Sequence, residues 1–155
     1  MTLEQWKDLQ NRIIEKTGYI RLPMLERINS IMVDLCSGIT DYYRADIAIH
    51  KVRALCDMSI IAIKELDVDY ETLRSKKLIK MDKLAFIRAI GLVGNFISAL
   101  GEEHQYVSLS QFLYSFVKKI ESEVNELGYN FYSAMIETIN AGLTKSADYS
   151  NCKIY

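Results

Sequence analysis

The sequence predicts an all-α protein, a bundle of five to six helices, and two observations lead to this fold class. Apolar residues recur at intervals of three and four along most of the chain, and capping residues and glycines separate these runs. No alternating apolar run bounded by turns indicates a strand. The chain has 155 residues, half of them apolar and one of them proline, which suffices for one globular core. We therefore expect a single α-helical domain over residues 1–155.

Three helices are expected in the first half of the chain. Thr2 and Gln5 have the spacing of a capping box, and Gly18 is a typical C-cap, so the first helix should lie between them. Pro23 favours the first turn of a second helix, which should run up to residues 41–46. Asp46 is then expected to cap a third helix. Its wide apolar face indicates that this helix is central.

Three further segments complete the predicted bundle. A basic stretch over residues 71–80 is expected to be a solvated connector, with phosphate binding by its cations as the alternative. Asp82 should begin a helix that Gly101 ends. Ser108 and Gln111 repeat the capping-box spacing, so the next helix should begin there and end at Gly128. A last helix is predicted from about Phe131 to Ala141, where Gly142 would end it.

A weak internal repeat relates the two halves of the chain. An offset of about 61 residues aligns about 25–75 with about 86–136, and it pairs Arg27 with Arg88 and Asp34 with Asn95. Two helical hairpins related by pseudo-symmetry would explain this alignment. A shared helix-hairpin-helix plan without duplication explains it equally well, so both interpretations stay open.

Charge and cysteine content narrow the function classes. A net charge of −1 gives no overall electrostatic reason to expect nucleic acid or an anionic membrane as a partner. Cys36, Cys56 and Cys152 lack C-x-x-C spacing, so neither a disulfide framework nor a zinc site is indicated, and a reducing compartment fits best. The first residues are charged and no segment reaches the roughly 20 apolar residues of a membrane span. We therefore expect a cytoplasmic protein.

Three stretches resemble segments of one enzyme superfamily. They are RALCDMSIIAI at residues 53–63, NELGYNFYSAMIETIN at 125–140 and INAGLTK at 139–145. In plan and in these short motifs the chain resembles the all-α nucleoside triphosphate pyrophosphohydrolases, which include MazG-like proteins, dimeric dUTPases and phage dCTPases. The resemblance implies a MazG-like fold, assembly as a homodimer or homotetramer, and a nucleotide as ligand. It implies Mg²⁺ as cofactor if the protein is an active enzyme, and no cofactor otherwise. It also makes a bacteriophage source plausible, in which case the protein would act in the host cytoplasm.

The resemblance implies particular site residues. Asn140 and Lys145 match the positions of the family that lie near the nucleotide phosphates, and Asn95 and Tyr129 are further candidates for nucleotide contact, the tyrosine by stacking on a base. The plain alternatives are a capped helix end for Asn140 and Lys145, and an aromatic ring that closes the core for Tyr129.

The metal-binding pattern of the family is degenerate in this chain. The family holds Mg²⁺ with carboxylates in E-x-x-E and E-x-x-D spacing, because this ion prefers hard oxygen ligands. Here each helix keeps one carboxylate, Asp34 in the second helix and Asp57 in the third, and the corresponding positions of the second half are uncharged. We take Asp34 and Asp57 as the candidate metal ligands; the plain alternatives are a solvated position for Asp34 and an ion pair with Arg53 or Lys64 for Asp57.

Three functions follow, in order of preference. The missing carboxylates favour a MazG-like protein that binds or sequesters a nucleotide or a nucleotide-derived signal without hydrolysing it. The first alternative is an active Mg²⁺-dependent pyrophosphohydrolase whose carboxylates lie elsewhere, and the second is a helical bundle that contacts other proteins. None of the three requires nucleic acid or a membrane.

Overall fold

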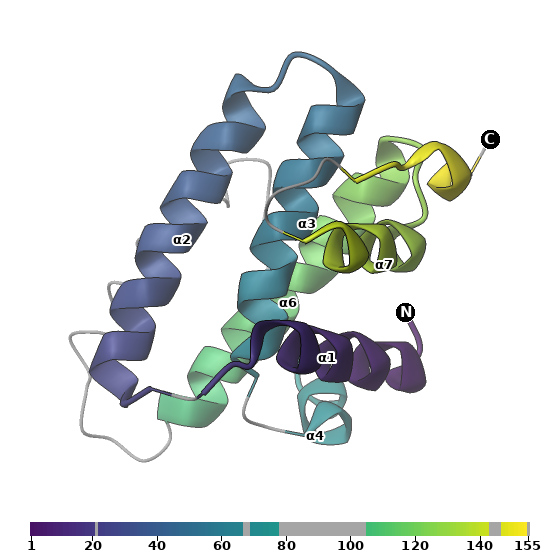
Figure 1. The fold of residues 1–155 in the computed structure, drawn as a ribbon. Helices are drawn as coiled ribbons and strands as arrows, with labels where there is room; N and C mark the ends of the chain where they lie inside the picture. The colour runs from purple at the N-terminus through teal and green to yellow at the C-terminus, as the bar shows by residue number, and fades with distance from the viewer. Residues whose placement is uncertain (21, 67–68, 78–104, 143–146, 155) are drawn as a thin grey trace.

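The computed structural model describes residues 1–20, 22–66, 69–77, 105–142 and 147–154, and within these ranges the chain is an all-α bundle (Figure 1). None of its helices in these ranges combines the length and the apolar character that crossing a bilayer demands. The α-helices are α1 (Leu3–Thr17), α2 (Met24–Arg44), α3 (Ala48–Lys64), α4 (Tyr70–Ser75), α6 (Gln105–Glu126) and α7 (Phe131–Ala141), and the short 3₁₀ helix η1 covers Ser150–Cys152.

The predicted ends of α1 are confirmed. The Thr2 hydroxyl accepts a hydrogen bond from the Gln5 backbone N–H at 3.2 Å, and the Gln5 side chain accepts one from the Thr2 N–H at 2.9 Å. Gly18 ends the helix in the left-handed region with φ of 60°. Side-chain and backbone hydrogen bonds at both ends therefore favour the observed start and end of α1.

The second and third helices form a closely packed hairpin, in which α2 lies at the outer side of the bundle and α3 lies between α2 and the other helices (Figure 1). Pro23 is the N-cap of α2, next to its expected place. The prediction that Asp46 caps α3 is wrong, because Ile47 occupies the N-cap position and no side chain caps this end. Gly38 of α2 lies against Met58 of α3 so closely that a Cβ atom at Gly38 would fall 2.2 Å from the Met58 Cγ atom.

The start of α6 also differs from the prediction. The helix is described from Gln105 onward, so Ser108 and Gln111 lie inside it and not at its N-terminus. The Gln111 side chain instead donates a hydrogen bond of 2.8 Å to the carbonyl oxygen of Lys77. Part of the expected basic connector is itself a short helix, α4, whose first turn is capped by Asp69. The spacing of Ser108 and Gln111 predicted an N-cap, but the helix extends further toward the N-terminus and Gln111 bonds to residue 77.

The end of α6 and the whole of α7 are as predicted. Gly128 has φ of 91°, its N–H bonds to the Asn125 carbonyl, and the Tyr129 N–H bonds to the Val124 carbonyl, which is the Schellman pattern. Asn130 then caps α7 through the Ser133 N–H at 2.9 Å. The helix covers Phe131–Ala141 and ends at Gly142.

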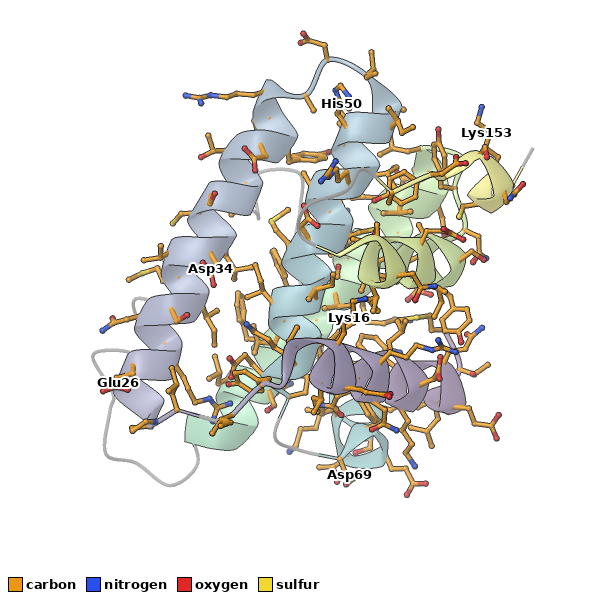
Figure 2. All side chains as sticks on the ribbon, in the orientation of Figure 1. Lys16, Glu26, Asp34, His50, Asp69 and Lys153 are labelled. Carbon is orange, nitrogen blue, oxygen red and sulfur yellow. The ribbon has the colours of Figure 1, made fainter. Side chains whose placement is uncertain are left out.

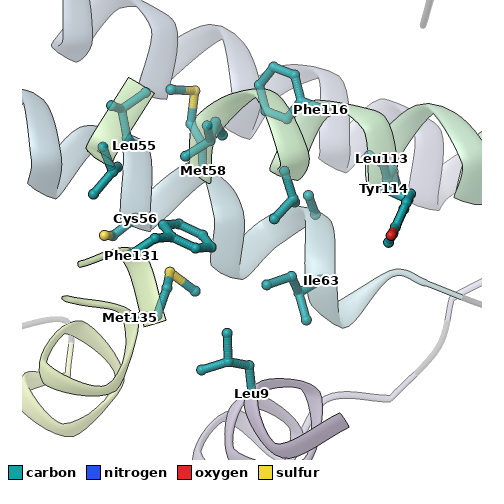
Figure 3. Close-up of a cluster of buried hydrophobic side chains, with 14 of the residues drawn as sticks. Leu9, Leu55, Cys56, Met58, Ile63, Leu113, Tyr114, Phe116, Phe131 and Met135 are labelled. Atoms are coloured by element: carbon teal, nitrogen blue, oxygen red, sulfur yellow. The ribbon is translucent and has the colours of Figure 1, made fainter. Parts of the chain in front are cut away.

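The core lies around α3, which contacts α1, α2, α6 and α7 and is therefore central, as predicted. Figure 3 shows Leu55, Cys56, Met58 and Ile63 of this helix among apolar side chains of its neighbours. Those neighbours include Leu9 from α1, Phe116 from α6 and Phe131 and Met135 from α7. Burial of side chains of this size contributes roughly 1.5–3 kcal/mol each, so the contacts of α3 hold the bundle together.

A buried polar cluster closes the end of α3. The Arg27 Nε atom donates to Glu65 Oε2 at 2.9 Å, and the Arg27 Nη2 atom donates to the Glu65 carbonyl at 2.9 Å. Gln10 donates to the carbonyl oxygens of Ile63 at 3.1 Å and Leu66 at 3.0 Å. Side chains from α1 and α2 therefore hydrogen-bond to one carbonyl in the last turn of α3 and to two carbonyls just beyond it.

The C-terminal segment pairs with the turn between α6 and α7. The Asn130 N–H bonds to the Cys152 carbonyl at 2.7 Å, and the Ile154 N–H bonds to the Gly128 carbonyl at 2.9 Å. The Thr138 and Tyr149 hydroxyls share a buried hydrogen bond of 2.7 Å. The helix expected between Asp82 and Gly101, and with it most of the second copy of the proposed repeat, lies outside the described residues.

Candidate functional site

The two candidate metal ligands lie on neighbouring helices. Asp34 is partly exposed in the middle of α2, where Figure 2 labels it, and Asp57 is an exposed residue of α3. Partial desolvation between the helices raises the pKa of the Asp57 carboxyl, the nearby Asp41 raises it further, and Arg53 opposes both effects. Because the residue is exposed, water screens part of this shift. The charged groups that influence Asp57 are thus Asp41 and Arg53.

This arrangement fits an ion pair better than a Mg²⁺ site. Arg53 supplies positive charge beside the carboxylate, whereas Mg²⁺ is held by converging oxygen atoms. Among the described residues, no group of three or more histidine, cysteine, aspartate and glutamate side chains could hold a metal ion. The metal-binding roles of Asp34 and Asp57 stay predictions.

The candidate nucleotide-binding residues do not form one cluster within the described structure. Asn140 is exposed in the last turn of α7, while Asn95 and Lys145 lie outside the described residues. Tyr129 is buried, and its ring meets that of Tyr149 edge to face with the centroids 6.4 Å apart. Tyr129 therefore closes part of the core, and the nucleotide-binding roles of these residues stay predictions.

A cavity of about 320 Å³ lies where the start of α1 meets α4 and α6. It is lined by three aromatic residues from three different helices, Trp6, Tyr70 and Tyr114, together with Met1, Thr2 and Leu3. Arg74 and Lys118 also line it, and no acidic side chain is among the described residues of the lining. The cavity therefore combines planar apolar surface with positive charge.

The aromatic wall is rigid because its rings contact one another. The Trp6 ring lies 4.9 Å from that of Tyr114 and 5.7 Å from that of Tyr70, measured between centroids. The Tyr70 hydroxyl donates to the Gln10 side chain at 2.8 Å, which anchors this ring to α1. Burial raises the pKa of Tyr70 well above its ordinary value, so the phenol stays neutral and keeps donating.

The two cations follow directly from helix geometry. Tyr70 and Arg74 are four residues apart on α4, and Tyr114 and Lys118 are four residues apart on α6. Residues at this spacing lie on one face of a helix, so each helix presents one tyrosine and one cation to the same cavity. Lys118 also forms an ion pair of 3.1 Å with Glu121, one turn further along α6.

The sequence indicates Arg74 only as part of a basic stretch that is either solvated or phosphate-binding, and it does not single out the other four residues. The signal was present as Tyr-x-x-x-Arg in one segment and Tyr-x-x-x-Lys in another. These two motifs do not indicate that α4 and α6 contact each other and the first turn of α1. The short helix α4, which positions Tyr70 and Arg74, was also not predicted.

Comparisons of the chain with protein-family models, with characterised proteins and with solved structures give no significant match. The resemblance to the pyrophosphohydrolases therefore stays a prediction from short sequence motifs, and the cavity has to be interpreted from its own chemistry.

Proposed function

We propose that the protein binds a nucleotide, or a small signal derived from one, without hydrolysing it. The observation that carries this proposal is the cavity between α1, α4 and α6, in which three aromatic residues adjoin Arg74 and Lys118. A nucleobase is planar and apolar on its faces, and a phosphate is an anion that arginine and lysine bind well. Both halves of a nucleotide thus find matching groups in one cavity.

The size of the cavity agrees with such a ligand. Its volume of about 320 Å³ lies at the lower end of the roughly 300–1,000 Å³ that is usual for small-molecule sites. The base would lie against the wall formed by Trp6, Tyr70 and Tyr114, and the phosphate would lie at the cationic side chains.

The same groups favour binding over hydrolysis. Arginine and lysine neutralise phosphate charge, but activation of an attacking water needs a general base or a metal-bound hydroxide. The described lining offers aromatic, cationic and small polar side chains, which are binding groups. A nucleotide held there would be released intact, which is the behaviour of a sensor or a sequestering protein.

The test is calorimetric titration with a panel of nucleotides, with and without Mg²⁺, followed by assay of each mixture for pyrophosphate. The double variant Arg74→Gln/Lys118→Gln should weaken binding by about tenfold or more, since charge-assisted hydrogen bonds to phosphate are lost. Lys153→Gln is the matched control, because Lys153 is an exposed cation at a distance from α4 (Figure 2). Equal binding by all three proteins would refute the assignment of the cavity, and released pyrophosphate would establish an active hydrolase.

A role in protein contacts, including self-assembly into a homodimer or homotetramer, is the second candidate. It is favoured by apolar side chains that stay exposed on α2 and at the tip of the α2–α3 hairpin: Val33 at 67%, Ile47 at 52% and Tyr43 at 50% exposure. Scattered exposed apolar residues are normal on monomers, so this observation is weaker than the cavity. Light scattering coupled to size exclusion, on the wild type and on Ile47→Ser/Tyr43→Ser, tests it; an assembly unaffected by the substitutions would exclude this face as the interface.

A further inference from the structure

We infer that the cavity selects a nucleoside monophosphate over the corresponding triphosphate, an inference that rests on the proposed function. It follows from the charges that surround the cationic end of the cavity. It concerns which nucleotide is bound. It can therefore be wrong even if the protein does bind a nucleotide.

The first step is the positive charge available to phosphate. Arg74 and Lys118 are the two cationic side chains of the described lining, one from α4 and one from α6. Each can donate hydrogen bonds to a phosphate oxygen, and the arginine can do so with two nitrogens at once. Two cations suit one phosphate group, which carries a charge of about −1.5 to −2 at neutral pH.

The second step is the negative charge beside the cationic end of the cavity. The Glu121 carboxylate lies 3.1 Å from the Lys118 ammonium. The side chain of Glu121 is only 14% exposed, and it also pairs with the amino group of Met1. It is therefore held in place next to one of the two phosphate-binding cations.

The third step is the balance of these charges. Arg74, Lys118 and the amino group of Met1 contribute three positive charges and Glu121 contributes one negative charge, which leaves a net charge of +2. A monophosphate nearly balances this charge, whereas the additional phosphates of a triphosphate would remain uncompensated and would be repelled by the Glu121 carboxylate. Specificity of this kind arises from a repulsive group as much as from an attractive one.

The volume of the cavity acts in the same direction. At about 320 Å³ it is small among nucleotide-sized sites. Once the base and sugar occupy the aromatic part, a chain of three phosphates would extend past Arg74 and Lys118 into solvent. The second and third phosphates would gain no further cationic side chain from the described lining, so they would add repulsion without adding such contacts.

The experiment measures dissociation constants for adenosine, AMP, ADP and ATP, and for the guanosine and thymidine series, by calorimetry in low salt with EDTA. Chelation of Mg²⁺ keeps the full phosphate charge, and low salt avoids screening it. We expect at least one monophosphate to bind about fivefold or more tightly than its triphosphate, because one unneutralised charge a few ångströms away has an effect of this order. The nucleoside should bind more weakly than the monophosphate.

The substitution that tests the mechanism is Glu121→Gln, which removes the repelling charge and keeps the shape of the side chain. We expect it to bring the ratio of the two constants closer to one by about threefold or more. Glu123→Gln is the matched control. Glu123 is on the same helix and has a similar exposure of 11%, but it pairs at 3.1 Å with Lys119, which is not among the described residues of the lining, and it influences Tyr42. This control should leave the ratio unchanged.

Each outcome decides one question. A triphosphate that binds as tightly as its monophosphate overturns the inference while it supports the proposed function. Equal changes in Glu121→Gln and Glu123→Gln overturn the role of Glu121, since they would show a general effect of net charge. Absence of binding by every nucleotide overturns the proposed function and the inference together. The wild-type ratio provides the first of these tests even if Glu121→Gln does not fold.

Discussion

Removal of Arg27 should be among the most damaging single substitutions in this protein. Arg27 and Glu65 are 1% and 3% exposed, and their side chains meet at 2.9 Å. In Arg27→Met the Glu65 carboxylate stays buried without its cation, and breaking a buried ion pair in this way typically costs about 3–5 kcal/mol. The Glu65 carbonyl also loses the hydrogen bond from Arg27 Nη2. We expect the free energy of unfolding, measured by urea denaturation, to fall by an amount in this range.

Two further variants distinguish the effect of burial on the ion pair from the effect of a short distance alone. Arg12→Gln breaks a pair of similar length, 2.8 Å between Arg12 Nε and Asp8 Oδ2, but both side chains are exposed, at 46% and 37%. It should change stability far less than Arg27→Met. The double variant Arg27→Met/Glu65→Gln should cost less than the sum of its single variants, because neither charge then remains buried alone. Equal effects of Arg27→Met and Arg12→Gln would refute the reasoning.

Three further predictions concern α2, α3 and the cysteines. Gly38→Ala should lower the free energy of unfolding by about 1–3 kcal/mol, because the added methyl group displaces the buried Met58 side chain; a neutral effect in urea denaturation would contradict the close approach of α2 and α3. Folding raises the pKa of the Asp57 carboxyl, so the folded protein loses stability as this group ionises above a pH of about 4. Asp57→Asn should therefore raise the melting temperature at pH 7 and change it little at pH 3. A melting temperature that Asp57→Asn lowers at pH 7 would show that the neighbours of Asp57 stabilise its charge. Burial raises the pKa of Cys56 to about 12, so only the partly exposed Cys36 should react quickly with a thiol reagent at pH 8, and fast reaction of all three thiols would contradict the packing of the core.

The ends of a helix could be predicted from the sequence where the capping residue bonds to the backbone of its own helix. Thr2, Gln5 and Gly18 bond to the backbone of their own helix, and Gly128 and Gly142 adopt positive φ, so their roles could be predicted from spacing alone. Asp46 and Ser108 have equally suitable side chains but do not cap a helix. The paths of α3 and α6 are set by packing against other helices, which a capping motif does not report.

The candidate site was far less predictable than the fold. The cavity is lined by residues 6, 70, 74, 114 and 118, which come from three separate segments of the chain. They meet because α4 packs against both α1 and α6 and the Trp6 ring contacts that of Tyr114. The family motifs instead indicated a metal site at carboxylates of α2 and α3. Asp57 has a perturbed pKa, as an unusual carboxylate should, but its electrostatic neighbours are Asp41 and Arg53. Those partners depend on the packing of the hairpin and cannot be derived from spacing along one helix.

The aromatic wall of the cavity also provides a built-in optical reporter. The chain contains one tryptophan, Trp6, so all of the indole fluorescence of the protein originates beside Tyr70 and Tyr114. Emission from a buried indole should be blue-shifted in the folded protein and should move to longer wavelength on unfolding. A base that enters the cavity should quench it. Occupancy of the cavity and integrity of the fold can therefore be followed as two separate signals in one unlabelled sample, one as intensity and the other as wavelength.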